Sequence, residues 1–283
     1  MSSVTQHSRA ATDHARRWSV LLLILASLPL WAVEDADAIL KRVAAAEGPY
    51  EERARQYTYQ EDVDRFSYKG GQLHKDRSDR FEIVFVEGLE YRRLIARNGK
   101  PLSPKEQAQV EMAMHQTADE RRKHRPPAAP GGRISYGSQQ ADLGSTSDLL
   151  ALFDNRLVGE EVVRGRRSWV IESTPKAGLT PANQHEKEVL CFKKKTWIDE
   201  TDNVIAWQIV TVVREGIFPK PGSSITFEFD KVGPDTWHAV SIVLDTYLAN
   251  GKRFEPTSRT EYRLSHFRKF DVQSTITVDV GKQ

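Results

Sequence analysis

The sequence has one cysteine, almost no surplus of charge of one sign, and no apolar run long enough to cross a membrane. Cys191 is the single cysteine among 283 residues, so no intrachain disulfide can form and the fold depends on its core. The apolar neighbours Leu190 and Phe192 favour a buried thiol over an exposed, reactive one. The formal net charge is +2, which leaves no basic surplus of the kind that nucleic-acid-binding proteins carry. No nucleic-acid partner is expected.

The longest apolar run lies near the N-terminus. Arg16 and Arg17 precede the uncharged residues 18–32, and acidic residues begin at Glu34. A basic start followed by a short apolar run is typical of a secretory signal peptide. The run is shorter than the roughly 20 residues that a membrane-spanning helix needs. We therefore expect residues 1–32 to be a signal peptide and residues 33–283 to form a single exported domain; an uncleaved N-terminal anchor is the alternative.

Export of this chain would release a protein without an anchor. Residues 1–32 contain three arginines and one aspartate, so the remaining chain has 38 basic and 38 acidic residues. No cysteine lies near the expected cleavage site to carry a lipid. The expected location is the periplasm, as a soluble protein.

Strand signals dominate the chain, interrupted by three helical patterns. The first helix is predicted over residues 36–46 and ends at Gly48-Pro49. A second over 103–124 begins with the capping box of Ser103 and Glu106. A third is predicted over 147–153. Strands are predicted over 57–68, 81–86, 91–96, 157–163, 168–173, 196–199, 204–214, 225–230, 237–248, 261–270 and 274–280.

The short spacing between these strands indicates hairpins rather than crossover units. The predicted fold class is mainly β (α+β): a strongly curved antiparallel sheet or unclosed β-barrel, covered by two to three helices. The breaker-rich stretch 126–132 is interpreted as a long loop inside this domain.

Motifs for catalysis or metal binding are missing from the sequence. It contains no H-E-x-x-H, no G-x-S-x-G, no phosphate-binding loop and no G-x-G-x-x-G. Asp199, Asp202 and Asn203 resemble part of a calcium loop, but Ile205 and Thr211 stand near the positions that need glycine and glutamate. We therefore expect no enzyme activity, no metal and no cofactor. An enzyme would need a carboxylate or histidine cluster within the fold.

Large aromatic residues recur on the predicted strands. They can form an ordinary filled core, or they can line an apolar cavity between a curved sheet and the helices over 103–124 and 147–153. Flexible, polarisable side chains such as Met114 suit a cavity wall that accepts varied ligands. His238, by contrast, is expected to face outward from its strand. The candidate cavity residues are Phe85, Met114, Leu150, Trp207 and Phe229.

Three stretches carry a resemblance to a known family. They are YRRLIARNGKPLSPKE (91–106), FDNRLVGEEVVRGRRSWVIESTPK (153–176) and WIDETDN (197–203). Together with the order of helices and strands, they resemble a bacterial branch of the periplasmic outer-membrane lipoprotein-sorting and carrier superfamily. The resemblance implies an unclosed antiparallel barrel whose helices cover a cavity for acyl chains, and it implies no catalytic residues.

The sequence thus predicts a soluble exported protein that binds an apolar ligand, such as a lipid or an acyl chain, between a curved sheet and a helical lid. An envelope membrane protein is a further expected partner, for loading or release. The alternative is a cell-envelope protein-interaction module with a filled core and no ligand.

Overall fold

A computed structural model describes residues 34–124, 133–136, 139–215, 220–250 and 253–270. The expected signal peptide, the loop at 126–132 and the expected last strand at 274–280 lie outside these residues. Residues Asp35–Gln283 cluster as one compact unit, separate from Met1–Glu34, and the description below concerns the larger unit. In the described part of the chain, no helix combines the length and the apolar character that a membrane span requires.

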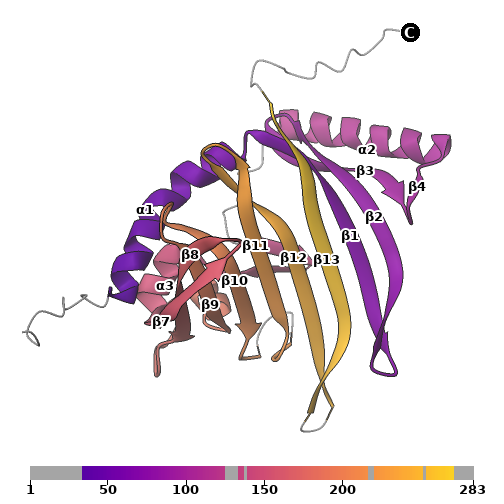
Figure 1. Ribbon diagram of the computed structural model, residues 1–283. Helices are drawn as coiled ribbons and strands as arrows, with labels where there is room; N and C mark the ends of the chain where they lie inside the picture. The colour runs from indigo at the N-terminus through magenta and orange to yellow at the C-terminus, as the bar shows by residue number, and fades with distance from the viewer. Residues whose placement is uncertain (1–33, 125–132, 137–138, 216–219, 251–252, 271–283) are drawn as a thin grey trace, which may run out of the picture. The chain divides into compact units, whose positions relative to one another are not determined.

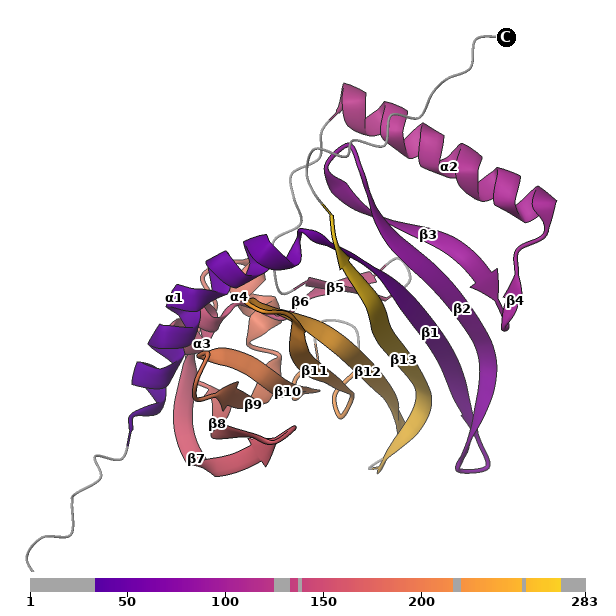
Figure 2. The same cartoon turned by 45° about the horizontal axis from the view of Figure 1, so that its top comes forward.

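One antiparallel sheet of eleven strands makes up most of the described chain. Its order is β4-β3-β2-β1-β13-β12-β11-β10-β9-β8-β7, and the ribbon curves around helix α1 (Figures 1 and 2). The strands are β1 (Tyr57–Lys69), β2 (Gln72–Val86), β3 (Leu89–Arg97), β4 (Lys100–Pro101), β7 (Phe153–Val163), β8 (Arg166–Pro175), β9 (Phe192–Asp199), β10 (Val204–Val212), β11 (Ser224–Gly233), β12 (Thr236–Asn250) and β13 (Arg253–Lys269). The predicted mainly β fold with an unclosed antiparallel sheet is confirmed.

The sheet is a series of hairpins joined at one long-range pairing. β1 pairs with β13, for example Val63 with Tyr262, and this pairing brings the first strand beside the last described one. β4 and β7 are therefore the two edges of the sheet. A separate hairpin is formed by β5 (Arg133–Tyr136) and β6 (Gln139–Asp142), and the helices are α1 (Ala36–Ala54), α2 (Pro104–Lys123), α3 (Thr146–Leu152) and α4 (Gln184–Val189).

Helix α1 is longer than the sequence predicted. It continues through Gly48 and Pro49 to Ala54, although a proline inside a helix costs about 3 kcal/mol through a lost hydrogen bond and a steric clash. Tertiary contacts favour the extension. Tyr50 packs against an apolar cluster that includes Val204 and Trp237, and Arg53 donates from Nε to the Asp235 carbonyl oxygen at 2.8 Å. The prediction that Gly48-Pro49 ends the helix was wrong because it ignored these contacts.

Helix α2 begins at the predicted capping box. The Ser103 hydroxyl accepts from the Glu106 N–H, and the Glu106 carboxylate accepts from the Ser103 N–H. The helix packs on β3 and β2. The Arg121 guanidinium donates to the carbonyl oxygens of Val86 and Leu89 at 2.9 and 2.8 Å, which attaches the helix to the β2–β3 turn. α2 thus lies near the β4 edge, apart from α1 and α3 (Figure 2).

The apolar core lies in the half of the sheet that contains β7–β12. One cluster joins α1, α3 and α4 to β7, β8 and β9, with Ile39, Leu40 and Ile198 each 0% exposed. A second cluster surrounds Phe192 on β9. The third consists of Val163, Val170, Trp197, Val204, Ala206 and Trp237, with Tyr50, Trp207, Ile209 and Phe229 packed against it.

Cys191 is buried, as the sequence predicted. Its Sγ donates to the Lys187 carbonyl oxygen at 3.3 Å. Burial raises the pKa of the thiol above its usual value, so the unreactive protonated form is favoured.

Candidate functional site

A cavity of about 420 Å³ lies between α1, the segment that leads into α3, and the strands β9 to β12. This volume falls in the lower half of the roughly 300–1,000 Å³ that is usual for small-molecule sites. Its lining is mainly apolar, with a smaller set of polar groups on one side. The apolar lining residues are Val43, Tyr50, Ala54, Leu143, Leu149, Val204, Ile205, Phe227, Phe229, Trp237, Ala239 and Ile242.

The strand register places the apolar residues of the cavity floor on one face of the sheet. Phe227 pairs directly with Ile242, and Phe229 pairs with Ala239; directly opposed residues of antiparallel strands project to the same side. The Phe227 and Phe229 rings stack with centroids 6.2 Å apart. Together these side chains form a continuous apolar surface below α1.

The opposite wall comes from one face of α1. Val43, Glu47, Tyr50 and Ala54 all line the cavity, and their spacing of three and four residues puts them in one row along a helix. Two of the four lie beyond Pro49, so the unexpected part of the helix supplies half of this wall. The regular spacing was visible in the sequence, but the assumed end at Gly48-Pro49 concealed it.

Glu47 and Thr146 form the best-defined polar contact of the cavity. The Thr146 hydroxyl donates to Oε1 of Glu47 at 3.2 Å. Burial raises the pKa of the Glu47 carboxyl above its usual value, while the hydrogen bonds from Thr146 and the positive charge of Lys194 act in the opposite direction. Lys194 reaches the same region from β9 and is only 4% exposed.

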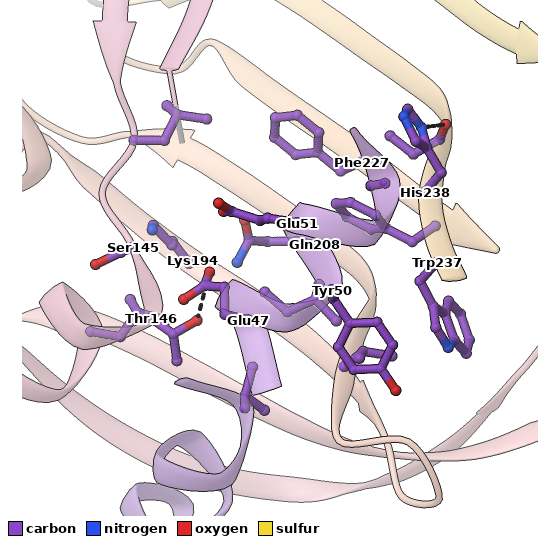
Figure 3. A pocket seen from close by; sticks show the side chains of 18 of the residues that line it. Glu47, Tyr50, Glu51, Ser145, Thr146, Lys194, Gln208, Phe227, Trp237 and His238 are labelled. Carbon is purple, nitrogen blue, oxygen red and sulfur yellow. Dashed lines mark hydrogen bonds between the residues drawn. The ribbon is translucent and has the colours of Figure 1, made fainter. Parts of the chain in front are cut away.

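Figure 3 shows that the cavity is polar on one side and aromatic on the other. Ser145, Thr146 and Lys194 lie on the polar side with Glu47. Phe227, Tyr50, Trp237 and His238 lie on the aromatic side, and Gln208 and Glu51 lie between the two groups. Such a lining matches a molecule that has one polar and one apolar end.

His238 lines the cavity, contrary to the expectation that it faces outward. Its ring lies 4.7 Å from the Tyr59 ring and 4.9 Å from the Phe267 ring, measured between centroids. Nδ1 donates to the Ala239 carbonyl oxygen at 2.9 Å. Burial lowers the pKa of the imidazole, so His238 is neutral at neutral pH and behaves as part of the aromatic wall. An irregular register between β11 and β12 near Phe229 accompanies this orientation.

Of the five residues predicted to line a cavity, the structure places Phe229 in this one. Trp207 lies on the same strand as a cavity residue, Gln208, but successive side chains of a strand point to opposite faces. Its ring instead packs 5.4 Å from that of Trp197. Leu150 packs on the neighbouring core cluster below α1.

Phe85 and Met114 lie near the other edge of the sheet. Phe85, on β2, stacks on Phe270 with ring centroids 4.8 Å apart. Met114 is on α2, which contributes no residue to the cavity. The helix over residues 103–124 therefore does not cover it, because Arg121 attaches that helix to the β2–β3 turn. α1 and the start of α3 provide the cover.

The hairpin turn at residues 200–203, which follows β9, borders the cavity. Asp199 is 0% exposed and accepts from the N–H groups of Thr201 and Asp202 and from the Arg166 guanidinium. Burial raises the pKa of Asp199, but these bonds outweigh it and lower the pKa below its usual value. Asp199 therefore stabilises a hairpin tip. Across the described ranges, no group of three or more His, Cys, Asp and Glu side chains could hold a metal ion.

The same turn is bonded to α1. Asn203 lines the cavity, and its Oδ1 accepts from Nε of Arg42 at 2.9 Å. The Arg42 guanidinium also lies over the Trp169 ring, 5.0 Å from the centroid. These contacts fix the helix above the strands and so fix the distance between the two walls.

Comparison with known proteins found no matching family model and no match among curated proteins. The search of solved structures found similar chains at low identity. A DUF1329 family protein from Desulfovibrio piger has 14% identity and a TM-score of 0.38, over 86% of this chain and 96% of that one. A putative outer membrane lipoprotein-sorting protein domain from Vibrio parahaemolyticus has 11% identity and a TM-score of 0.38, over 84% and 95%. A LolA superfamily protein from Nitrosomonas europaea has 11% identity and a TM-score of 0.36, over 84% and 95%. The lipoprotein-sorting proteins that the sequence resembles are thus among these matches.

Proposed function

We propose that this chain binds an apolar molecule, such as a lipid or an acyl chain, in the cavity below α1. The observation that carries this proposal is the cavity itself: about 420 Å³, with twelve apolar residues in its lining. Such a space supports ligand binding over the alternative, a protein-interaction module with a filled core. We assign no catalytic step to the site.

Apolar burial would supply the binding energy. Each methylene group removed from water contributes about 0.8 kcal/mol. Two additional methylenes would therefore raise the affinity about 15-fold, until the chain fills the cavity. Val43, Tyr50 and Ala54 of α1 and the stacked phenylalanines of β11 provide apolar surface on both sides of the ligand chain.

A series of neutral 1-alkanols tests this proposal without involving charge. We expect the dissociation constants of octanol, decanol and dodecanol, measured by displacement of N-phenyl-1-naphthylamine fluorescence, to fall about 15-fold at each step. A plateau would mark the length at which the cavity is full. Absence of probe and alkanol binding by the wild-type protein would overturn the proposal.

Two substitutions on the same helix provide a matched comparison. Ala54 lines the cavity, whereas Ala45 is exposed on α1. Ala54→Trp should fill part of the cavity and weaken alkanol binding at least about tenfold, because the indole ring occupies volume that the ligand needs. Ala45→Trp should leave the affinity unchanged. Circular dichroism and thermal unfolding of both variants would identify any loss of folding, and equal alkanol affinity of the two folded variants would contradict the site assignment.

We further propose that the protein acts after export, as a periplasmic carrier. The basic start and short apolar run of residues 1–32 support this proposal. Expression in a bacterium, followed by cell fractionation and mass measurement, would test it. The expected product is a periplasmic protein that has lost a segment close to residues 1–32. A full-length protein in the membrane fraction would support an uncleaved anchor instead.

A further inference from the structure

The polar side of the cavity contains a buried cation. Lys194 is 4% exposed, and it belongs to a run of three lysines in which Lys193 is exposed and Lys195 is intermediate. Lys194 lies on the floor of the cavity, whereas the acidic residues Glu47 and Glu51 belong to the helix above it. The most buried charged side chain of the lining is therefore positive.

The register of β9 explains why this lysine faces inward. Lys194 pairs with Val210 on one side and with Ser173 on the other, and these neighbours are 0% and 1% exposed. Directly opposed residues share a face of the sheet, so Lys194 belongs to the covered face. Its Nζ lies 6.0 Å from the centroid of the buried Phe153 ring.

The two glutamates of α1 differ from Lys194 in their surroundings. Glu51 forms an exposed i,i+4 ion pair with Arg55 at 3.7 Å, where the side chains are 44% and 53% exposed. Glu47 accepts from Thr146, and burial raises the pKa of its carboxyl. Burial therefore makes Glu47 easier to neutralise, whereas an ammonium in a desolvated site is stabilised by additional negative charge.

We propose that the ligand is an anionic amphiphile of the fatty-acid type, whose carboxylate binds the Lys194 ammonium while its chain extends toward Tyr50 and Phe227. This proposal rests on the proposed function and names the class of ligand. An ammonium group has three N–H donors, so a ligand carboxylate adds to the contacts that Lys194 makes within the protein. Thr146 lies on the polar side, and the Gln208 carboxamide lies between this side and the aromatic side. No bond is made or broken in this binding.

Three ligands with the same chain separate the contribution of the head group from that of the chain. Dodecanoate, 1-dodecanol and dodecylammonium should be compared at pH 8 by displacement of N-phenyl-1-naphthylamine. We expect dodecanoate to bind at least about tenfold more tightly than dodecanol, because hydrogen bonds to charged groups are the stronger ones. Dodecylammonium should bind most weakly, since it brings a second cation next to Lys194.

A matched pair of lysine variants tests the residue. Lys194→Met keeps a long side chain and removes the charge, and Lys193→Met removes the same charge from an exposed position one residue away. Lys194→Met should lose the preference for dodecanoate, a change of at least about tenfold, and keep its affinity for dodecanol. Lys193→Met should behave as the wild type. Glu47→Gln provides an independent test if Lys194→Met fails to fold: it removes a negative charge near the head group and should strengthen dodecanoate binding several-fold.

The outcomes for the ligand class and for the cavity can be told apart. Equal affinity for dodecanoate and dodecanol in the wild type would overturn the anionic ligand and leave apolar binding intact. The same conclusion would follow if Lys194→Met bound dodecanoate as tightly as Lys193→Met did, or if Glu47→Gln had no effect. Failure of all three ligands to bind would instead reject the proposed function.

Discussion

The two halves of the one large sheet are stabilised by different interactions. The half formed by β7–β12 buries apolar side chains against α1, α3 and α4, and Phe192 and Ile198 are each 0% exposed. In the half formed by β1–β3 and β13, several of the buried groups are carboxylates. Asp64 and Asp79 are each 2% exposed. The apolar half contains the cavity, whereas the charged half extends beyond α1 toward α2 (Figure 1).

Asp79 shows how the charged half buries an ion. Oδ2 lies 2.7 Å from Nη1 of Arg65 and 2.7 Å from Nε of Arg77, and Oδ1 lies 3.6 Å from Nε of Arg97. These arginine side chains are 41–48% exposed while the carboxylate side chain is 1% exposed. The arginines therefore cover the carboxylate with their aliphatic stems and keep part of each side chain in water. A strand can therefore bury carboxylates at its centre when arginine side chains surround them.

The largest expected effect is in the apolar half. Phe192→Ala should lower the free energy of unfolding by about 3–5 kcal/mol, because the substitution removes a fully buried ring and leaves a cavity. Phe192 packs with Leu143, Val210 and Ile225 among others. Equilibrium urea unfolding measures the change. Leu73→Ala, at a 39% exposed position of the charged half, is the control and should change stability by less than about 0.5 kcal/mol. Similar losses for the two variants would contradict the comparison.

The second largest effect is expected for Asp79 in the charged half. Asp79→Asn should lower the free energy of unfolding by about 1.5–3 kcal/mol, the range for hydrogen bonds to charged groups, because three arginines would lose their common partner. Asp76→Asn is the control: Asp76 is 44% exposed and lies 3.9 Å from Lys69. An exposed pair of this kind contributes about 0–1 kcal/mol. Urea unfolding at low and at high salt would measure both variants; equal small effects would show that the burial of the carboxylate is unimportant.

Acid should destabilise the charged half through Asp64. Burial raises the pKa of this carboxyl, but hydrogen bonds from Ser78, Arg263 and Lys75 outweigh it and lower the pKa to about 2, from 3.8. A pKa that is lower in the folded state gives stability that is complete above the unfolded value and is lost as the pH falls through the folded value. The loss should therefore occur between about pH 4 and pH 2 and amount to about 2 kcal/mol.

Urea unfolding as a function of pH measures this contribution. Asp64→Asn should lose it at neutral pH and show a correspondingly flatter pH dependence between about pH 4 and pH 2. An exposed carboxyl in the same hairpin, Asp76, provides the control variant. An Asp64→Asn profile parallel to that of the wild type would reject the role of Asp64.

The sequence predicted local structure well where the signals are local. The capping box of Ser103 and Glu106 marks the start of α2. The helix predicted over 147–153 is found at Thr146–Leu152. The end of α1 was missed, because the contacts that keep Pro49 inside the helix are made with distant parts of the chain, for example between Arg53 and Asp235, which are 182 positions apart. The short helix α4 was missed too, although Asn183 accepts from the Glu186 N–H as an N-cap should.

The cavity was harder to predict than the fold. Which face of a strand is covered depends on the pairing register, and the sequence did not fix that register for Trp207 and Gln208. Lys194 stands between two lysines, and such a run is normally a solvated strand. Lys194 is nevertheless buried, because α1 crosses the strands of the apolar half. This crossing is a property of the topology and cannot be seen in the run of lysines.

The smallest expected effect is that of an exposed ion pair in the apolar half, which serves as a contrast to the buried carboxylates of the charged half. Arg156 and Glu172 form a pair between β7 and β8 at 2.8 Å, with side chains 75% and 43% exposed. Neither group is buried, so solvent screens the attraction and the coupling should be about 0–1 kcal/mol. A double-mutant cycle of Arg156→Ala and Glu172→Ala in urea unfolding measures it. If the coupling equalled the loss measured for Asp79→Asn, a short distance between the charges would be sufficient for stabilisation. A much smaller value would show that the charged half owes its stability to carboxylates that arginine stems remove from water.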